Sequence, residues 1–232
     1  ISGSKLWTND IKVNFPYSSS DTDPEVGMDS AGNATIAWEW NANIIVQKLS
    51  PNGDYLWGLI FARSDYTEGN QFNPSVFIDE AGNAFVAWRH WFSSSNSTEI
   101  CLQKLDVHGN TEWIRDAQAN TKSGTAVQSA GKALPYGEDV FLLWTDYGAE
   151  GRYIQRFGVN GVRKWASNIN INSGVTVLDQ DNNLATIWIA TDQYDTENLY
   201  FQKMDVNGNQ LWSAPLSISL PEAIVYGRVS AD

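Results

Sequence analysis

The chain repeats itself about every 50 residues, and this period constrains its fold more than any other feature of the sequence. Residues 24–38 (PEVGMDSAGNATIAW) and 74–88 (PSVFIDEAGNAFVAW) share the pattern P-x-V-x-x-D-x-A-G-N-A-x-x-A-W. Each is followed by a second block that ends in another tryptophan, at 44–57 and 100–113. A fixed period of this length indicates a repeat architecture in which each unit packs on the next.

Two looser copies extend the series. One combines VFLLW (140–144) with YIQRFGVNGVRKW (153–165), and the other combines DQDNNLATIW (179–188) with LYFQKMDVNGNQLW (199–212). The repeat therefore accounts for most of the 11 tryptophans, namely Trp7, Trp38, Trp57, Trp88, Trp113, Trp144, Trp165, Trp188 and Trp212. Only Trp40 and Trp91 lie outside it.

The fourth copy contains ENLYFQ (197–202), which has the sequence of a protease-cleavable purification tag. Gln202 falls in register with Gln47, Gln103 and Gln155, and each of the four is followed by Lys or Arg. The segment is therefore predicted to be a native strand rather than a cloning remnant, which would have to be set aside before any argument about the fold.

Each unit is predicted to form four short strands. Segments such as AFVAW (84–88) and ICLQKLD (100–106) are rich in β-branched and aromatic residues, and they end in Asp-, Asn- and Gly-containing turns. No window shows a helical period. Adjacent positions of the third strand are both apolar, which indicates that both faces of each sheet are covered. The pattern predicts an all-β protein, a β-propeller of four-stranded blades, with a β-solenoid as the main competitor.

We interpret residues 1–232 as a single repeat domain. Its units are predicted at about 16–66, 67–122, 123–172 and 173–220, with partial units at 1–15 and 221–232. The propeller is five-bladed if the two partial units share a blade. Otherwise the chain is a segment of a larger propeller, the interpretation that we favour, and in either case it is expected to be an excised part of a longer product.

Composition excludes several classes of protein. Hydrophobic residues make up 42% of the chain and charged residues 18%, which is typical of an ordered globular protein. The net charge of -12 would repel nucleic acid and anionic membranes, and no apolar run is long enough to span a bilayer. Cys101 is the single cysteine, so neither an internal disulfide nor a Cys/His metal framework is expected.

The motif P-x-V-x-x-D-x-x-G-N-x-x-x-x-W, followed by Q-K-x-D-x-x-G-x-x-x-W, resembles the propeller-type repeats of large secreted and surface-attached bacterial proteins, including secretion cargo of Bacteroidetes. This resemblance implies an extracellular or cell-surface propeller within a larger polypeptide. The turn before each closing tryptophan also resembles the Asp box of sialidase-like propellers. SPNGDYLW (50–57) departs from that motif, however, with one residue too many between Gly and Trp.

Trp40 and Trp91 are candidate ligand-binding residues because the repeat does not require them. Tyr147 and Tyr194 fall in the corresponding segments of the later units. All four are expected where the second strand turns into the third, on one rim of the scaffold. Exposed aromatics there would suit sugar rings or protein partners. The competing interpretation is packing between blades.

Glu39, Asp146 and Asp192 lie beside these aromatics and would accept hydrogen bonds from sugar hydroxyls. The competing interpretation is that they are solvated surface acids. Paired carboxylates would also serve a glycosidase, but the sequence places no two of them at catalytic separation.

His90 is expected in a loop next to Trp91, where it would contact a ligand. His108 is expected in a turn and Cys101 in the core. The sequence predicts no catalytic residues, no metal ligands and no cofactor. Calcium is weighed only for turns such as DQDNN (179–183), which lack the spacing of a calcium loop.

The sequence thus favours a non-catalytic extracellular recognition or adhesion module that binds a glycan or a surface protein. A structural scaffold within a larger polypeptide or surface assembly is the second interpretation. A polysaccharide-active enzyme is the third, because the fold alone does not specify the function.

Overall fold

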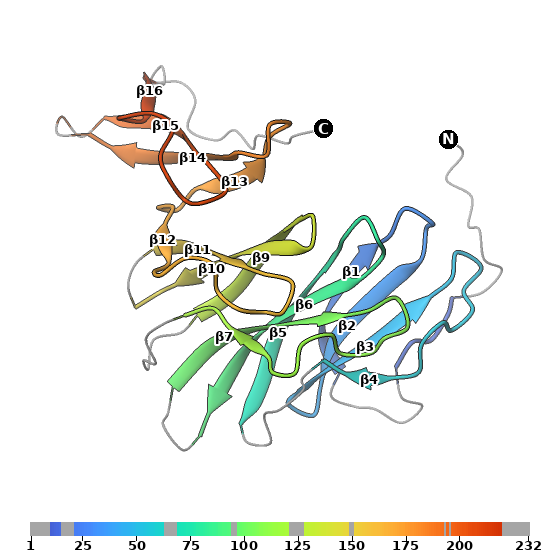
Figure 1. Ribbon diagram of the computed structural model, residues 1–232. Coiled ribbons are helices and arrows are strands. Elements are labelled where there is room, and N and C mark those ends of the chain that lie inside the picture. The colour runs from blue at the N-terminus through green and yellow to red at the C-terminus, as the bar shows by residue number, and fades with distance from the viewer. Residues whose placement is uncertain are drawn as a thin grey trace. The chain divides into compact units, whose positions relative to one another are not determined.

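The computed structural model describes residues 10–14, 21–62, 69–93, 97–120, 128–148, 151–192, 194 and 196–219. Its sixteen strands form four antiparallel sheets of four strands each (Figure 1). We call the sheets blades 1 to 4. Blade 1 contains β1 (Asp21–Met28), β2 (Ala34–Trp40), β3 (Asn43–Leu49) and β4 (Ile60–Phe61). Blade 2 contains β5 (Asn70–Ile78), β6 (Ala84–Phe92), β7 (Ser97–Leu105) and β8 (Ala117–Gln118). Blade 3 contains β9 (Gln128–Tyr136), β10 (Asp139–Asp146), β11 (Gly151–Phe157) and β12 (Ile169–Asn170). Blade 4 contains β13 (Val175–Leu178), β14 (Leu184–Thr191), β15 (Glu197–Met204) and β16 (Leu216–Ser219).

These sheets confirm the all-β prediction of four-stranded units. ENLYFQ lies on β15, as its register predicted. Within the described part of the chain, no helix has the length and apolar character needed to cross a membrane.

The first hairpins of blades 1, 2 and 4 owe their turns to a repeated aspartate, at Asp29, Asp79 and Asp179. In blade 1, the Asp29 carboxylate accepts hydrogen bonds from the backbone N–H of Asn33 (2.8 Å) and from its side-chain amide (2.8 Å). Gly32 completes the turn at φ 80°, a conformation that a side chain would disfavour. The same contacts recur at Asp79 in blade 2. This is the turn chemistry that the D-x-x-G-N motif predicted.

The chain divides into two compact units, residues 1–169 and 170–232. In the first unit, the innermost strands β1, β5 and β9 lie side by side (Figure 1). One face of blade 1, with Ala37, Ile44 and Val46, packs on Val86 and Trp88 of blade 2. The opposite face of blade 2 packs in the same way on blade 3. The blades of this unit are therefore stacked face to face, with the core between them.

The repeated glutamine and the closing tryptophan connect strands and blades. Gln103 donates to the carbonyl of Trp113 (3.2 Å) and accepts from its N–H (3.1 Å). The indole of Trp113 then donates to the carbonyl of Val159 in blade 3 (2.7 Å). Trp57 makes the equivalent bond to Val107 in blade 2 (2.8 Å). Trp57 and Trp113 are thus structural residues.

The second unit contains blade 4, whose strands pair in the order β13-β14-β15-β16. Thr176 and Thr186 hydrogen-bond between β13 and β14, and the rings of Trp188 and Tyr200 stack between β14 and β15. The interpretation of the whole chain as one repeat domain, with the unit boundaries given above, stays a prediction.

Candidate functional site

The innermost strands of blades 1 and 2 are both interrupted near their starts by a β-bulge. The pairing of β1 with β2 shifts between Thr22 and Glu25, and the pairing of β5 with β6 shifts between Phe72 and Ser75. Asp23 lies in the first bulge and Asn73 in the second, each followed by a proline. Both have φ of 49°, a left-handed conformation that non-glycine residues rarely adopt. Strain of this kind is often found at functional sites.

The two bulges are directly linked. The side-chain amide of Asn73 donates to the Asp23 carboxylate at 2.9 Å, and both side chains are exposed to solvent. Asp23 and Asn73 hold equivalent positions in blades 1 and 2. The hydrogen bond therefore joins the same position of two neighbouring inner strands, and it fixes an exposed carboxylate beside them.

Glu39, on β2, is the second carboxylate near these bulges. It pairs with Thr22 across the sheet, and its side chain is partly buried. Partial burial raises the pKa of Glu39, and the negative charge of Asp23 raises it further. A hydrogen bond with Thr22 and the charge of Arg89 act in the opposite direction but do not cancel the increase. Glu39 therefore keeps its proton to a higher pH than an ordinary glutamate.

Arg89 holds the position in β6 that Glu39 holds in β2. Its guanidinium lies 5.0 Å from the centre of the Phe72 ring, which orients the cation. Its positive charge acts to lower the pKa of Glu39, which belongs to the neighbouring blade. Two carboxylates, an amide and a guanidinium thus gather where β1 and β2 of blade 1 adjoin β5 and β6 of blade 2. We call Asp23, Glu39, Asn73 and Arg89 the bulge site.

Of the predicted residues, the structure brings Glu39 alone into this site. Trp40 and Trp91 lie on β2 and β6 and are partly buried, not in the connecting segments where they were expected. Glu39 pairs with Thr22 and Ile44, whereas Trp40 pairs with Asp21 and Asn43. Because successive residues of a strand point to opposite faces, Glu39 and Trp40 cannot form one sugar platform.

His90 also differs from its expected position. It belongs to β6 rather than to a loop, and its side chain is completely buried. Its ring lies 4.2 Å from that of Phe92. A ring buried in this way packs the end of the blade and offers no surface to a ligand, so we leave His90 out of the site.

Asp146 and Asp192 mark the corresponding ends of blades 3 and 4, and both carboxylates support turns. Asp146 accepts a hydrogen bond from the N–H of Gly148 (3.0 Å). Asp192 accepts from the N–H groups of Tyr194 (2.8 Å) and Thr196 (3.0 Å), and the bond from Thr196 is the main cause of its lowered pKa. Tyr147 and Tyr194 are highly exposed beside them, so ligand binding at these residues stays a prediction.

Sequence reasoning missed Asp23, Asn73 and Arg89. The signal was present at the margin of the repeat, because Asp-Pro at 23–24 and Asn-Pro at 73–74 directly precede the aligned motif. Arg89 follows its tryptophan as Glu39 follows Trp38. These are positions at which two nearly identical copies change chemistry. Such differences would have indicated the site more directly than the unmatched tryptophans did.

The described residues of the first unit also line two pockets. One of about 200 Å³ adjoins the bulge site and is lined by Asp21, Thr22, Pro24 and Trp38, among others. A larger one of about 710 Å³ lies between the segment that follows Trp113 and the β11 hairpin. Burial at that pocket lowers the pKa of Arg163. It contains none of the four residues of the bulge site.

Among the residues that the structure describes, no three His, Cys, Asp or Glu side chains gather as a metal-binding group. In the 179–183 turn considered for calcium, the Asp179 carboxylate accepts from the N–H groups of Asp181 and Asn183 and from the ammonium of Lys203. These contacts are ordinary turn and ion-pair chemistry.

Several solved structures share this fold. An α-L-arabinofuranosidase from Fusarium graminearum, solved with an iminosugar inhibitor, matches with a TM-score of 0.55 and 10% identity over 85% of this chain and 66% of its own. An α-L-arabinanase from Penicillium chrysogenum, solved with arabinobiose, has a TM-score of 0.55 and 10% identity over 86% and 66%. A protein of unknown function from Dyadobacter fermentans has a TM-score of 0.56 and 11% identity over 87% and 65%. The fold is a β-propeller.

The chain spans slightly less than two thirds of the length of each of these proteins. No protein-family model matches the sequence, and no curated protein is significantly similar to it.

The neighbours correct the functional interpretation of the sequence. A non-catalytic recognition module was favoured and a scaffold came second, yet the characterised structures reported above are enzymes that act on arabinose-containing glycans. These neighbours contradict the prediction that the protein is not an enzyme. The sequence did not place Asp23 near Glu39, because the two are 16 residues apart and Asp23 lies in the bulge of β1.

Proposed function

We propose that the chain is part of a polysaccharide-active glycoside hydrolase, that the bulge site is its catalytic centre, and that its substrate is an arabinose-containing glycan. The observation that carries the proposal is the pairing of Glu39, whose pKa is raised, with the nearby carboxylate of Asp23. Cleavage of a glycosidic bond requires one protonated and one ionised carboxyl group on either side of the bond.

Glu39 is suited to be the general acid. Its raised pKa keeps the proton available, and Asp23 favours the protonated form. In the reaction, the Glu39 carboxyl group donates its proton to the glycosidic oxygen as the bond from that oxygen to the anomeric carbon breaks. The departing sugar leaves as an alcohol, and Glu39 becomes a carboxylate.

Asp23 supplies the second carboxylate, which either deprotonates the attacking water or attacks the anomeric carbon itself. Asn73 holds this carboxylate by the 2.9 Å hydrogen bond and leaves its remaining acceptor sites open to solvent. Arg89 binds substrate hydroxyls and stabilises Glu39 once its proton has been transferred. In this scheme, every residue of the bulge site takes part in substrate binding or catalysis.

The substrate class is supported by the structural neighbours, which include an arabinofuranosidase and an arabinanase. An extracellular location agrees with a polymeric substrate and with the resemblance to repeats of secreted bacterial proteins.

The proposal is tested by the release of reducing sugar from arabinan, with xylan and galactan as comparison substrates. We expect the wild-type protein to hydrolyse arabinan and Glu39→Gln to be slower by about 10²–10⁴-fold. The control is Glu80→Gln, which changes an exposed turn residue of blade 2 and should retain full activity. A wild-type protein that hydrolyses none of the polymers, or a Glu39→Gln variant as active as the control, would overturn the proposal.

The pH profile provides a second readout. Loss of the Glu39 proton should lower the rate on the alkaline side, at a pH above the ordinary glutamate range because the pKa of Glu39 is raised. Glu39→Gln should lose this limb. An unchanged alkaline limb in the variant would exclude Glu39 as the acid.

A further inference from the structure

The larger pocket of the first unit exists because blade 2 departs from the repeat. Ile60 of blade 1 and Ala117 of blade 2 hold the same position in their outermost strands. The Cδ1 atom of Ile60 lies 3.3 Å from the place that a Cβ atom on Gly109 would take, so Ile60 fills the space beside the hairpin of blade 2. Ala117 has only a methyl group, and a pocket of about 710 Å³ opens between it and Gly161 in the equivalent hairpin of blade 3. A volume of this size accommodates a small organic ligand.

Arg163 brings a positive charge into this pocket, and it too departs from the repeat. It forms the isolated β-bridge of its hairpin, a position that is uncharged in the other blades, at Tyr55, Thr111 and Gln210. Its guanidinium is partly buried and donates to the carbonyl of Ala119 (3.1 Å) and to the side-chain oxygen of Asn168. Both acceptors are neutral, and they use two of the five N–H groups of a guanidinium.

The charge of Arg163 is not compensated by an ion pair. Among the residues that the structure describes, no carboxylate forms such a pair with it, whereas Lys48, Arg156 and Lys203 each pair with an aspartate. Partial burial lowers the pKa of Arg163, because the charged form loses hydration. Charges removed from water are normally paired in proteins. An anionic group of a ligand would supply the missing counter-charge.

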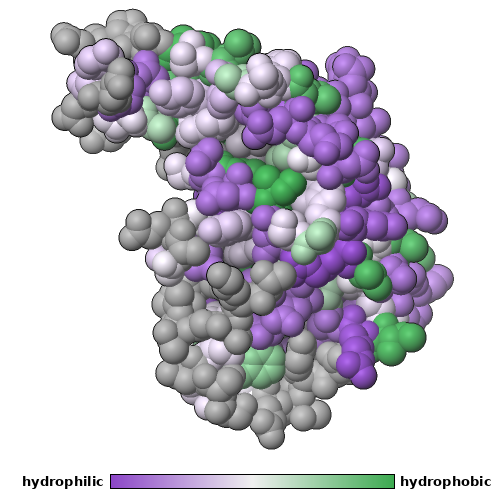
Figure 2. All heavy atoms as spheres, turned by 60° about the vertical axis from the view of Figure 1, so that its left-hand side comes forward, coloured by the Kyte–Doolittle hydropathy of each residue, from purple (hydrophilic) through white to green (hydrophobic). Residues whose placement is uncertain are grey.

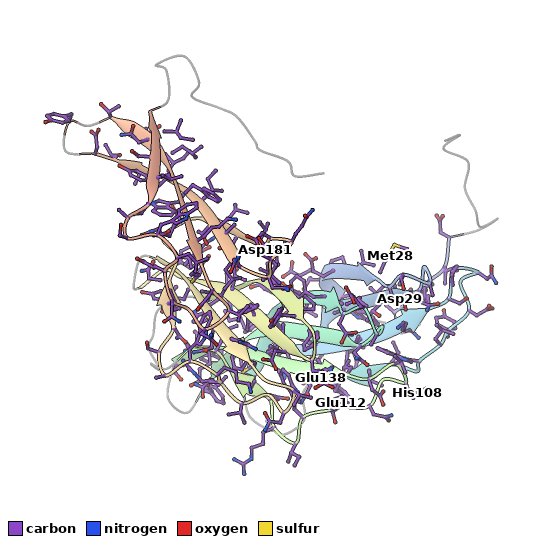
Figure 3. The ribbon with its side chains drawn as sticks, turned by 45° about the horizontal axis from the view of Figure 1, so that its top comes forward. Met28, Asp29, His108, Glu112, Glu138 and Asp181 are labelled. Carbon is purple, nitrogen blue, oxygen red and sulfur yellow. The ribbon has the colours of Figure 1, made fainter. Side chains whose placement is uncertain are left out.

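The other charged groups of the pocket indicate which kind of anion fits. Arg115 lines the pocket and is exposed, so it adds a second guanidinium. Glu112, labelled in Figure 3, also lines the pocket and is exposed. The remaining acid, Asp116, is 6% exposed and accepts a hydrogen bond from Gln103 within blade 2 (2.9 Å). Glu112 would repel a simple inorganic anion, but an acidic sugar offers a carboxylate to the arginines and hydroxyl donors to Glu112.

Neutral groups of the lining also suit a sugar. Asn160 is exposed, and its side-chain amide can donate to ligand oxygens. Ile114 and Val162 are 94% and 59% exposed and offer aliphatic surface to the C–H groups of a sugar ring. On the face that Figure 2 shows, hydrophilic residues predominate and hydrophobic residues form small separate patches. Such a surface lacks the large continuous apolar area that is typical of protein docking.

We propose that this pocket binds an acidic sugar, a uronic acid unit of a glycan, whose carboxylate lies against the guanidinium groups of Arg163 and Arg115. Arginine is the side chain best suited to hold a carboxylate, because its planar N–H groups match the two carboxylate oxygens. Glu112 and Asn160 bind the ring hydroxyls. The pocket shares no residue with the bulge site, so this inference goes beyond the proposed hydrolysis and does not depend on it.

The experiment titrates the isotope-labelled protein with digalacturonate and follows the backbone amide signals by NMR. Two further probes separate the features of the ligand: the dimethyl ester of digalacturonate has the same rings without charge, and acetate has the carboxylate without a ring. Arg163→Gln and Arg115→Gln each remove one positive charge from the pocket. Lys164→Gln is the matched control, because Lys164 is the adjacent cation, is exposed and does not line the pocket. The amide spectrum verifies that each variant is folded.

We expect digalacturonate to bind the wild-type protein, and the ester and acetate to bind at least about tenfold more weakly. Arg163→Gln and Arg115→Gln should each weaken the binding of digalacturonate by at least about tenfold. Lys164→Gln should bind it as the wild type does.

Three results would overturn the proposal. The first is a wild-type spectrum that digalacturonate does not change. The second is an ester or acetate that binds as tightly as digalacturonate, because the protein would then recognise the rings alone or any carboxylate. The third is unchanged binding by Arg115→Gln, a substitution at an exposed residue that tests the pocket even if Arg163→Gln does not fold.

Discussion

Blades 1 and 2 have almost the same backbone but differ in chemistry. Both carry a proline-flanked bulge, an aspartate turn and a closing tryptophan that donates to the next blade. At the bulge site, however, blade 1 has Asp23 and Glu39 where blade 2 has Asn73 and Arg89. Residues shared by the copies therefore stabilise the fold, whereas residues that differ between them are free to acquire a function.

The largest effect on stability is expected at a shared position. Trp113 is 2% exposed and joins blades 2 and 3 through its indole N–H. Trp113→Ala should lower the free energy of unfolding by about 3–5 kcal/mol, because a large buried side chain is lost. Urea denaturation followed by circular dichroism measures the change. A loss below about 1 kcal/mol would contradict the structural role of the repeated tryptophans.

A second shared position is the lysine after the repeated glutamine. Its replacement should lower the stability of the protein more in blade 1 than in blade 4. Lys48 and Asp29 form an ion pair at 3.0 Å with side chains only 4% and 7% exposed, whereas Lys203 and Asp179 are 28% and 19% exposed. Lys48→Met should cost about 3 kcal/mol because it leaves a buried charge without its partner. Lys203→Met should cost less than about 1 kcal/mol because water screens the pair. Equal losses in urea denaturation would refute this distinction.

The ion pair between Lys203 and Asp179 in blade 4 should make the stability of the protein depend on pH. The hydrogen bond from Lys203 is the main cause that lowers the pKa of Asp179 from 3.8 to about 2. Because the folded state binds this proton less readily than the unfolded state, the stabilisation is complete above pH 3.8 and is lost as the pH falls towards about 2. Asp179→Asn should flatten the stability profile in this window. Urea midpoints measured from pH 2 to 5 test the effect, and an unchanged slope would contradict it.

The smallest effect is expected at an exposed aromatic that takes no part in the repeat. Tyr194 is 77% exposed, so Tyr194→Ala should change the free energy of unfolding by less than about 0.5 kcal/mol. The same variant tests the predicted ligand-binding role of Tyr194. A change in the KM for arabinan at unaltered stability would support that role, and an unchanged KM would exclude it.

The strands and the repeated packing residues could be predicted from the sequence because they depend on local and repeated signals. Trp113 and Gln103 were recognised from their spacing, and the strand that contains ENLYFQ was recognised from its register. The bulge site could not be predicted from the sequence, for two physical reasons. A bulge depends on pairing between strands, which the period alone does not reveal, and the alternation of faces separates Glu39 from the neighbouring Trp40. The burial of His90 likewise depends on strand pairing and tertiary packing.

The most direct test of the account replaces Asp23 by the residue that blade 2 carries at the same position. Asp23→Asn should fold with the wild-type free energy of unfolding to within about 0.5 kcal/mol, because Asn73 shows that this bulge accepts asparagine. Its hydrolysis of arabinan should fall by at least about 10²-fold, because the second carboxylate is lost. A folded Asp23→Asn variant that retains the full rate of arabinan hydrolysis would contradict the assignment of the bulge site as the catalytic centre.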